Sequence, residues 1–437
     1  MTFWQRQVTL AKLALPILFG TMAVTLLNFI DTAMVAQLGS TALAATGLGA
    51  FAAMMLTVAL NGLGTGVQAL TARRSGEGNL KEECVPLNGG LLLALAVGFP
   101  MAVACFFLIP HVFPLLTNDV AVIKDGVPYL QALLAPLGFF GGNAAFRGYW
   151  NGVGKNTVYM MVLVVSVILN IFGNWVLIYG NLGAPALGTT GAGLASCFTT
   201  VVATLIYLSL VLCKAPNRGF LRRRPKREQM SSLIGQALPA GIRGLGTSGG
   251  YLVFFWMTGL VGTATLAATN VLFRFYALIL LPASALGTAG ATLVGQNLGR
   301  GDPMAAKRWG WTTCATGFVV MSLVCLPMVF APHFLLSLFV VNPQEMVPPL
   351  QLLGLTAGFT CLEPVLRFAL FGAGDSKRVM KLTLLVQWLV FLPAVWMVIS
   401  VNGGLLSIWT VLILSGILSA ALYAWHWQNS PWAKIKI

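Results

Sequence analysis

A single carboxylic acid interrupts the first long apolar run of the chain. Asp31 stands in the stretch LLNFIDTAMVAQLG. An ionisable side chain among apolar residues is costly, so it marks a candidate functional site. Removal from water favours the protonated form of a carboxyl, and Asp31 could therefore take up a proton near neutral pH. With oxygen atoms from neighbouring groups it could instead hold Na⁺, and we expect no other metal ion. A purely structural hydrogen bond is the third interpretation.

Two amides form a second candidate group. Asn170 and Asn174 interrupt the apolar run LNIFGNWVLIYG at a spacing of i, i+4, which places them on one face of a helix. Their carbonyl oxygens could help to ligate a cation, or their amides could pass a hydrogen bond to Asp31. The alternative is that they join neighbouring helices by polar contacts. We interpret Asp31, Asn170 and Asn174 as the candidate cation-coupling residues.

Charged residues of both signs lie in the second half of the chain. Glu363 and Arg367 are also spaced i, i+4, with the acid first, which is the favourable order for a helical ion pair. Arg243 and Arg274 each stand well inside an apolar run. They could pair with Glu363, extend to the inner membrane face or meet an anionic substrate, and the sequence leaves all three open.

The elements that hold these residues must be membrane helices. Of the 437 residues, 57% are hydrophobic and 8% are charged, against about 25% charged in soluble proteins. This composition excludes a soluble enzyme, a coiled coil and a disordered chain. The apolar runs are long and do not alternate, so we expect an all-α polytopic membrane protein. No nucleophile–base pair, metal cluster or C-x-x-C motif occurs, and we expect neither an enzyme nor a cofactor.

Twelve segments are long and apolar enough to span a bilayer, which takes roughly 20 residues of helix. Pro16 lies inside the first of them and is the candidate helix bend. The twelve predicted spans are 8–35, 43–70, 87–108, 128–150, 157–180, 190–213, 233–260, 265–293, 311–340, 349–372, 379–400 and 405–427.

The net charge of +15 is explained by membrane topology and not by nucleic acid. Nearly all Lys and Arg residues fall in the termini and in alternate loops, and only Lys124 falls in a loop on the other side. Because cytoplasmic loops are enriched in Lys and Arg, both termini are predicted to be cytoplasmic. The densest basic stretch, 214–227, is either a tether that fixes this topology or a contact for anionic lipid.

The chain repeats itself at about half its length. Gly39–Thr46 (GSTALAAT) matches Gly262–Thr269 (GTATLAAT), and Pro16 matches Pro239 at the same offset. Further matches follow in register, with a slightly smaller offset towards the end of each half, where Arg147 matches Arg367. Six spans in each half make the repeats parallel, and two facing bundles with a cleft between them suit alternating access.

This repeat predicts three parts: a six-helix bundle over 1–213, a basic cytoplasmic linker over 214–230 and a second bundle over 231–437. The halves differ in charge, because Asp31 corresponds to Phe254 and Glu363 corresponds to Asn143. The expected coupling carboxylate therefore belongs to the first half alone.

Several motifs make the sequence similar to a known family. They are ALPILFG and LNFIDTAMVAQLG in the first span, FRGYWNGVGKNT, LNIFGNWVLIYGNLGAPALGTTGAGLAS and LRFALFGAGDSK. Together they resemble the multidrug and toxic compound extrusion (MATE) family, in its NorM-like branch. The resemblance implies twelve helices in two parallel-repeat bundles and the exchange of inward-moving Na⁺ or H⁺ for an exported organic compound. The family's aspartate in helix one maps onto Asp31, its bend proline onto Pro16 and its polar pair onto Asn170 and Asn174.

One position departs from the family pattern. The acidic residue in helix seven of NorM-like proteins maps onto Thr247, and this half of the chain carries Arg243 and Arg274 instead. The departure counts against a Na⁺ site in the second half and weakens the expectation of a cationic substrate.

We therefore expect a secondary antiporter that exports small organic, amphiphilic compounds, cations among them, in exchange for H⁺ or Na⁺. The alternative is a flippase or exporter of a lipid-linked or anionic metabolite. We expect a monomer in the bacterial inner membrane, in contact with membrane lipid and with no nucleic-acid partner. Besides the coupling residues, the candidates for the substrate cleft are Asn28, Asn143, Arg243, Thr247, Arg274, Glu363 and Arg367.

Overall fold

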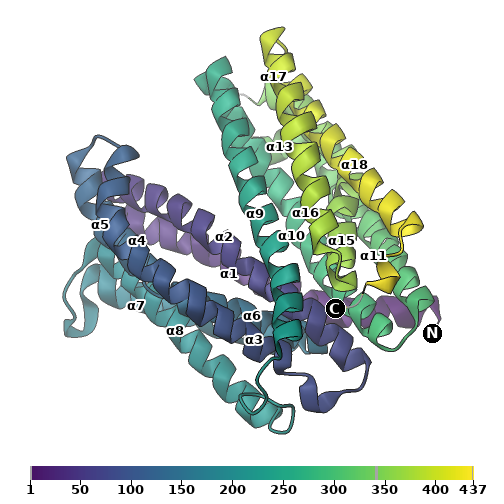
Figure 1. Ribbon diagram of the computed structural model, residues 1–437. Helices are drawn as coiled ribbons and strands as arrows, with labels where there is room; N and C mark the ends of the chain where they lie inside the picture. Colours follow the sequence, from purple (N-terminus) through teal and green to yellow (C-terminus); the bar gives the residue numbers. More distant parts are fainter. Residues whose placement is uncertain (1, 340–342, 436) are drawn as a thin grey trace. The chain divides into compact units, whose positions relative to one another are not determined.

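The computed structural model describes residues 2–339, 343–435 and 437, and within them it contains helices and no strand (Figure 1). The α-helices of the first half are α1 (Phe3–Ala36), α2 (Ser40–Gly76), α3 (Val85–Leu93), α4 (Phe99–Val112), α5 (Val120–Leu134), α6 (Leu137–Val153), α7 (Asn156–Tyr179) and α8 (Gly188–Lys214). Those of the second half are α9 (Arg227–Val261), α10 (Thr263–Gly299), α11 (Pro303–Val324), α12 (Leu326–Phe330), α13 (Pro332–Ser337), α14 (Val347–Leu355), α15 (Ala357–Ala373), α16 (Ser376–Leu385), α17 (Leu392–Ser400) and α18 (Leu405–Asn429).

The helices match the predicted membrane spans. Among the described residues, nine are long and apolar enough to cross a membrane, or up to eleven if each of two bent pairs counts as one span. The bends are 46° between α5 and α6 and 56° between Gln344–Leu355 and α15. α9 has 35 residues and is long enough as well, but it is not among the nine helices that are also apolar enough. The prediction of an all-α polytopic membrane protein is confirmed, although the expected end of the ninth span, residue 340, lies outside the described residues.

The internal repeat is visible in the backbone. α2 and α10 both have 37 residues, and α6 and α15 both have 17. Gly154, with φ 80°, directly follows α6, and Gly374, with φ 87°, directly follows α15. This left-handed conformation favours glycine, because it carries no Cβ to clash with the preceding turn. The same stop signal therefore ends corresponding helices in both halves.

Small residues allow corresponding helix pairs to approach closely. A Cβ added to Gly64 of α2 would lie 2.7 Å from the carbonyl oxygen of Ala144 in α6. In the second half, a Cβ added to Gly287 of α10 would lie 3.1 Å from the carbonyl oxygen of Pro364 in α15. The α2–α6 and α10–α15 contacts thus use equivalent glycines, as expected for membrane helices, which pack through small residues.

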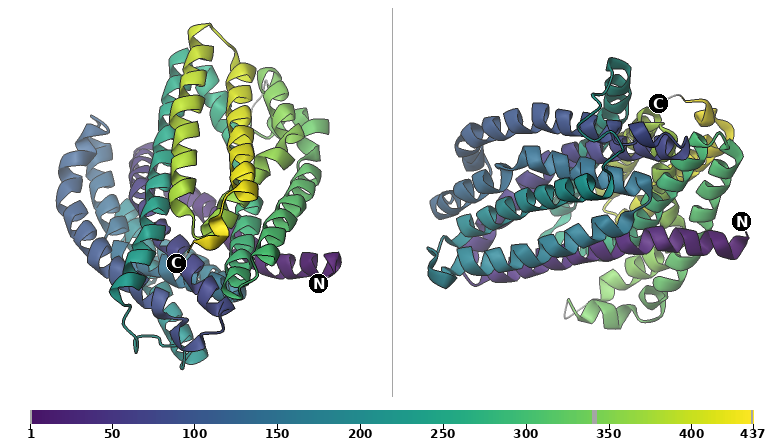
Figure 2. Two further views of the ribbon diagram at one scale, coloured as in Figure 1. Left: turned by 45° about the vertical axis from the view of Figure 1, so that its right-hand side comes forward. Right: turned by 90° about the horizontal axis from the view of Figure 1, so that it is seen from below.

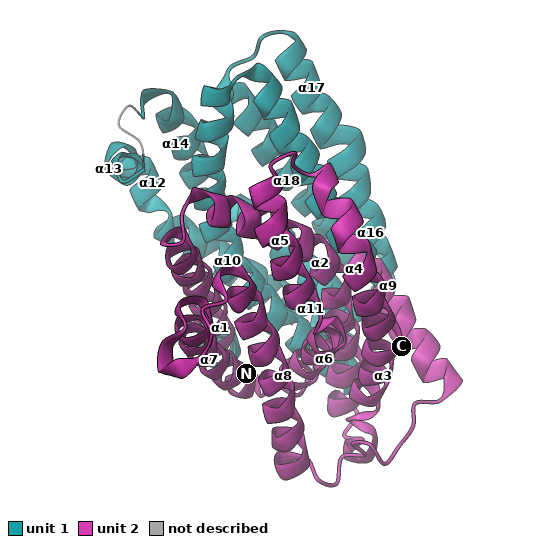
Figure 3. Cartoon of the chain, turned by 90° about the vertical axis from the view of Figure 1, so that its left-hand side faces the viewer, with its two compact units in different colours: residues 1–15, 242–437 teal, residues 16–241 magenta. Residues whose placement is uncertain are grey.

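The described chain divides into two compact units, shown in two colours in Figure 3. One comprises Pro16–Gly241, and the other comprises Met1–Leu15 with Ile242–Ile437. The division falls inside α1 and α9, which run on through it. In the second unit, the span Ser376–Ser400 and α18 lie side by side (Figure 2). The predicted division at 213 and 230 stays a prediction.

Specific contacts hold the chain on one side of each boundary between the units, in α1 and in α9. The hydroxyl of Thr316 in α11 donates to Oε1 of Gln7 at 2.8 Å, which fixes the first turns of α1 in the second unit. Gly241 belongs to the first unit, where an added Cβ would lie 2.6 Å from the carbonyl oxygen of Ala59 in α2. Each of the two helices thus contributes a segment to both units.

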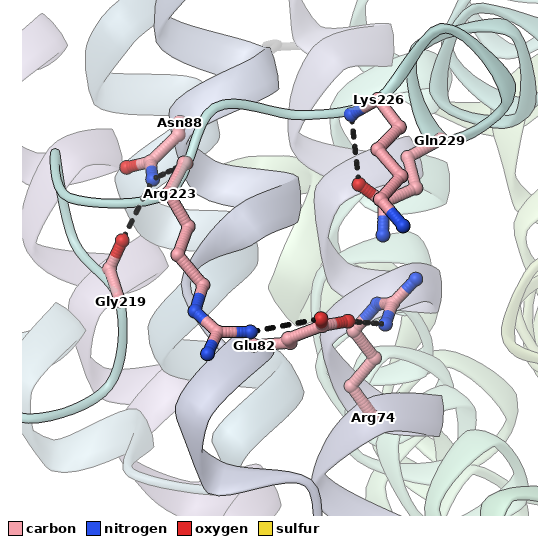
Figure 4. A network of polar contacts seen from close by, with 7 residues as sticks. All are labelled: Arg74, Glu82, Asn88, Gly219, Arg223, Lys226 and Gln229. Atoms are coloured by element: carbon pink, nitrogen blue, oxygen red, sulfur yellow. Dashed lines mark hydrogen bonds and ion pairs between the residues drawn. The ribbon is translucent and has the colours of Figure 1, made fainter.

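The basic linker between α8 and α9 is held against the first unit (Figure 4). Glu82 receives hydrogen bonds from Arg74 at 2.9 Å and from Arg223 at 3.0 Å. Asn88 donates to the carbonyl oxygens of Gly219 at 3.0 Å and Arg223 at 2.8 Å. Arg218 pairs with the buried Glu83. The linker is therefore an ordered part of the first unit, while its other basic side chains are exposed.

We expect the variant Gly64→Ala to destabilise the protein by about 1–3 kcal/mol, because the new methyl group would press on the backbone of α6. Unfolding of the detergent-purified protein on heating would show this as a lower midpoint. Gly47→Ala is the matched control on the same helix, since a Cβ there meets nothing within 4 Å. Equal midpoints for the two variants would contradict the close contact.

Candidate functional site

Asp31 is joined to the two predicted amides by hydrogen bonds. The side-chain nitrogen of Asn174 in α7 donates to Oδ1 of Asp31 at 2.7 Å and to Oδ1 of Asn170 at 3.1 Å. Asn170 in turn donates to the hydroxyl of Ser196 in α8 at 3.2 Å. Both amides are buried, and Asp31 is partly buried. The structure therefore brings the three predicted coupling residues together in the first unit.

One atom of this cluster has no partner among the described residues. Oδ1 of Asn174 is buried, and no donor from the described part of the chain reaches it. A buried acceptor without a donor costs about 1–3 kcal/mol. The assignment of oxygen and nitrogen in this amide follows from the hydrogen bond to Asp31. The carboxylate and the unsatisfied amide oxygen together offer the kind of ligands that a bare cation or an added proton would use.

The surrounding helices fix the position of Asp31. Gly173 lies between the two amides in α7, and a Cβ there would be 3.2 Å from Cβ of Ala195, so α7 and α8 pack closely at this level. The hydroxyl of Tyr179 donates to the carbonyl oxygen of Met34 at 2.9 Å, which attaches the end of α1 to the end of α7. The hydrogen bond from Tyr179 to Met34, one turn after Asp31 in α1, therefore holds this part of α1 against α7.

A polar path continues from the cluster along α8. The hydroxyl of Thr200 donates to the carbonyl oxygen of Ser196 at 2.8 Å, and the amide of Asn143 in α6 donates to the carbonyl oxygen of Thr200 at 3.0 Å. The hydroxyl of Thr204 donates to Oδ1 of Asn143 at 2.9 Å. The path leads into a cavity of about 190 Å³ lined by Asn143, Thr200 and Arg147. Arg147 donates to Oδ1 of Asn61 at 2.8 Å.

The second unit has a corresponding cavity of about 260 Å³. Lining positions of the two cavities correspond at the offset that relates Arg147 to Arg367: Phe140 and Thr360, Asn143 and Glu363, Leu163 and Thr383, Ser166 and Val386. In the second unit Nε of Arg367 contacts Oε1 of Glu363 at 2.9 Å. Arg243 and Thr247 of α9 line the same cavity.

The repeated architecture matches a known family. The MatE family model matches residues 16–176 and 239–397 of the chain. The chain belongs to the MATE family of multidrug and toxic compound extrusion transporters. The two matched segments start at Pro16 and Pro239, which are corresponding positions in the two halves of the sequence. The first segment contains Asp31, and the second contains the Glu363–Arg367 pair.

Curated relatives agree with this membership. The chain is 27% identical to the probable multidrug resistance protein NorM of Burkholderia pseudomallei, over 96% of this chain and 92% of the relative. It is 24% identical to the multidrug resistance protein MdtK of Edwardsiella ictaluri, over 96% and 94%. The predicted resemblance to the NorM-like branch is therefore confirmed.

Solved MATE structures share the fold over nearly the whole chain. An outward-facing multidrug resistance MATE transporter of the MOP superfamily has a TM-score of 0.88 at 20% identity and covers 99% of this chain and 97% of its own. A MATE crystal structure in the bent conformation also has a TM-score of 0.88, at 21% identity over 96% and 94%. At this identity the comparison shows the fold, and it confirms the predicted two-bundle architecture.

The seven candidates for the substrate cleft separate into groups. Arg243, Thr247, Glu363 and Arg367 line the cavity of the second unit. Asn143 lines the cavity of the first unit. Asn28 and Arg274 are exposed and line neither of these two cavities. Pro16 lies within α1, which continues through it without a break.

Sequence reasoning missed several polar residues of these sites. Ser196, Thr200 and Thr204 were not singled out, because Ser and Thr are frequent in membrane helices and their spacing carries no signal by itself. Gln387 was also missed; its amide donates to the carbonyl oxygen of Thr247 at 2.9 Å, and it lies in a π-helical turn, Val386–Phe391, that joins α16 and α17. Such turns often mark functional positions. Among the described residues, no three His, Cys, Asp or Glu side chains could jointly hold a metal ion.

We expect Glu363→Gln to destabilise the protein by roughly 3 kcal/mol, because it leaves two guanidinium groups in one cavity without a carboxylate. The double variant Glu363→Gln/Arg243→Gln restores the original net charge of the cavity and should recover part of the loss. Thermal midpoints of detergent-purified protein measure both. Glu345→Gln, an exposed acid of the same unit, is the control. A double variant no more stable than the single one would contradict this charge balance.

Proposed function

We propose that the protein is a secondary active antiporter that exports small organic compounds in exchange for H⁺ or Na⁺ by alternating access. Asp31 is the residue that carries the coupling cation, with Asn174 and Asn170 as its supporting groups. The protein acts as a monomer in the bacterial inner membrane, in contact with membrane lipid and with both termini in the cytoplasm. The names of the curated relatives, multidrug resistance proteins, and the one-sided distribution of Lys and Arg support this proposal.

The observation that carries the proposal is the unsatisfied oxygen beside Asp31. In the described part of the chain, the side-chain nitrogen of Asn174 donates to Asp31 and to Asn170, whereas the side-chain oxygen of Asn174 receives no hydrogen bond. A protonated Asp31 can donate to this oxygen when the Asn174 amide turns over, and Na⁺ can be ligated by the Asp31 carboxylate and the Asn174 oxygen together. Binding of the cation thus satisfies a polar group that is otherwise buried at a cost.

Helix α1 connects this event to the substrate. Pro16 has no N–H to donate to the carbonyl oxygen of Lys12. Helix α1 therefore bends most easily at Pro16, about one turn before its midpoint. A change at Asp31 alters how firmly the second part of α1 is held by α7. Cation binding repacks or bends α1, which reduces the space for the substrate and releases it, and the cation then leaves on the inside. Crystal structures of MATE in straight and bent conformations support two available states for this fold.

We expect Asp31→Asn to abolish coupled efflux while the protein reaches the membrane at normal levels. The reason is that an amide can neither exchange a proton nor neutralise a cation. Uptake of a fluorescent organic cation and, beside it, of a fluorescent organic anion into inverted vesicles measures this activity. Asp119→Asn is the matched control, since Asp119 is exposed and its role as an N-cap is kept by Asn. Efflux at the unmodified rate in Asp31→Asn would remove Asp31 from the mechanism.

The same vesicles identify the coupling ion. A proton gradient and a sodium gradient are imposed separately, and the gradient that drives uptake is the one that Asp31 uses. We expect one of the two gradients to drive uptake in the unmodified protein and neither to do so in Asp31→Asn. Uptake driven equally in both proteins would show that the cation is coupled elsewhere.

A further inference from the structure

The cavity of the second unit holds more positive than negative charge. Its lining includes two guanidinium groups, Arg243 and Arg367, and one carboxylate, Glu363. The carboxylate is committed to Arg367, at 2.9 Å and one helical turn away. Arg243 is left with a contact to the ring of Phe371, 5.9 Å from its centre. With all three groups ionised, the cavity has a net charge of +1.

Two hydrogen-bond donors in this cavity have no acceptor among the described residues. Nε of Arg243 and the hydroxyl of Thr247 are both buried without a hydrogen-bond partner there. The two residues are spaced i, i+4 on α9, so they lie on the same face of that helix, and both line the cavity. Buried donors are almost always paired in folded proteins. A pair of adjacent unsatisfied donors, one of them positively charged, is the complement of an oxyanion.

Comparison of the two halves shows that Arg243 is the surplus charge. Arg367 has a counterpart in Arg147, and Glu363 has one in Asn143. At the offset that relates Pro16 of α1 to Pro239 of α9, Arg243 corresponds to Gly20. Gly20 packs against Leu163, with an added Cβ 2.9 Å from its Cδ1. The repeated architecture therefore does not require an arginine at this place.

Part of the remaining lining fits a flat apolar body. Tyr251, Tyr276, Phe391 and Leu412 supply rings and an aliphatic side chain around the polar groups. The volume of about 260 Å³ lies just below the usual range for small-molecule sites, which favours a compact ligand. A compact aromatic molecule with one charged end matches both the volume and the lining.

We propose that this cavity binds a small aromatic carboxylate, with its carboxylate group on Arg243 and Thr247. The inference rests on the proposed transport function and names its substrate class: a monoanionic organic compound. The carboxylate balances the surplus charge of Arg243, and its oxygens accept hydrogen bonds from Arg243 and Thr247 once these buried donors turn towards the cavity. The Glu363–Arg367 ion pair stays intact beside the bound carboxylate and forms part of the cavity wall.

Equilibrium dialysis of the detergent-purified full chain against 2-naphthoate tests the proposal. The matched probes are 2-naphthamide, which is neutral, 2-naphthylmethylammonium, which is a cation, and 2-naphthyl phosphate, which carries a second negative charge. We expect 2-naphthoate to bind about tenfold or more tightly than the amide or the cation, the factor expected from a charge-assisted hydrogen bond. Tighter binding of the phosphate than of the carboxylate would overturn the monoanion match.

Variants locate the site. Arg243→Gln should weaken binding of 2-naphthoate about tenfold, Thr247→Val should weaken it less, and Arg243→Lys should retain most of it. Arg300→Gln is the charge-matched control, because Arg300 is exposed at the end of α10. Unchanged binding in Arg243→Gln, or equal binding of the cation, would overturn the proposal. If Arg243→Gln does not fold, the ranking of the four probes on the unmodified protein decides.

The dialysis needs no ion gradient, so it separates this proposal from the transport mechanism. In the Asp31→Asn background, Arg243→Gln should weaken binding of 2-naphthoate by the same factor as in the unmodified protein, because Arg243 lines this cavity and Asp31 does not. Binding of 2-naphthoate without cation-coupled transport would support the site and contradict the antiport. Cation-coupled transport of other compounds without binding of 2-naphthoate would leave the antiport intact and contradict the site.

Discussion

Every ionisable group inside a bilayer needs a partner, and this requirement explains where the polar residues of the protein lie. Asp31 is met by the amide of Asn174, and Glu363 is met by Arg367. Within the described residues, Arg243 is met by an aromatic ring, and such a contact is worth about 0.5–2 kcal/mol. An unpaired arginine in the middle of a membrane helix costs about 2.5–3.5 kcal/mol or more. Compensation is incomplete at Asn174 and Arg243, each of which has a buried polar atom with no hydrogen-bond partner in the described part of the chain.

The internal repeat supplies one architecture twice, and a few substitutions give the two halves different chemistry. The position equivalent to Asp31 is Phe254, which is fully buried and packs against Phe391 with ring centres 5.3 Å apart. The position equivalent to Arg243 is Gly20. The first half therefore carries an acid on its first helix, and the second half carries a base on the corresponding helix. Under the two proposals made above, one half handles the cation and the other half handles the substrate.

Much of this arrangement could be predicted from the sequence, because the bilayer imposes long apolar runs and the repeat fixes their pairing. The cluster of Asp31, Asn170 and Asn174 could be predicted because polar residues in apolar runs are rare and the i, i+4 spacing defines a face. The path through Ser196 and Thr200 could not, since it uses backbone carbonyls and common hydroxyl residues. Nor could the cavities, because their walls come from helices that are distant in the sequence and meet only in the folded unit.

The charge of the substrate decides the energetics of the exchange. With Asp31 as the coupling carboxyl, export of a monovalent cation for one H⁺ or Na⁺ moves no net charge, so only the ion gradient drives it. Export of a monoanion for one inward cation moves two charges in the direction that an inside-negative potential favours. Each charge is worth about 2.3 kcal/mol per 100 mV. A single coupling residue is therefore sufficient to concentrate an anion outside the cell. The described lining of the second cavity, whose carboxylate is already paired with Arg367, is consistent with such a transporter.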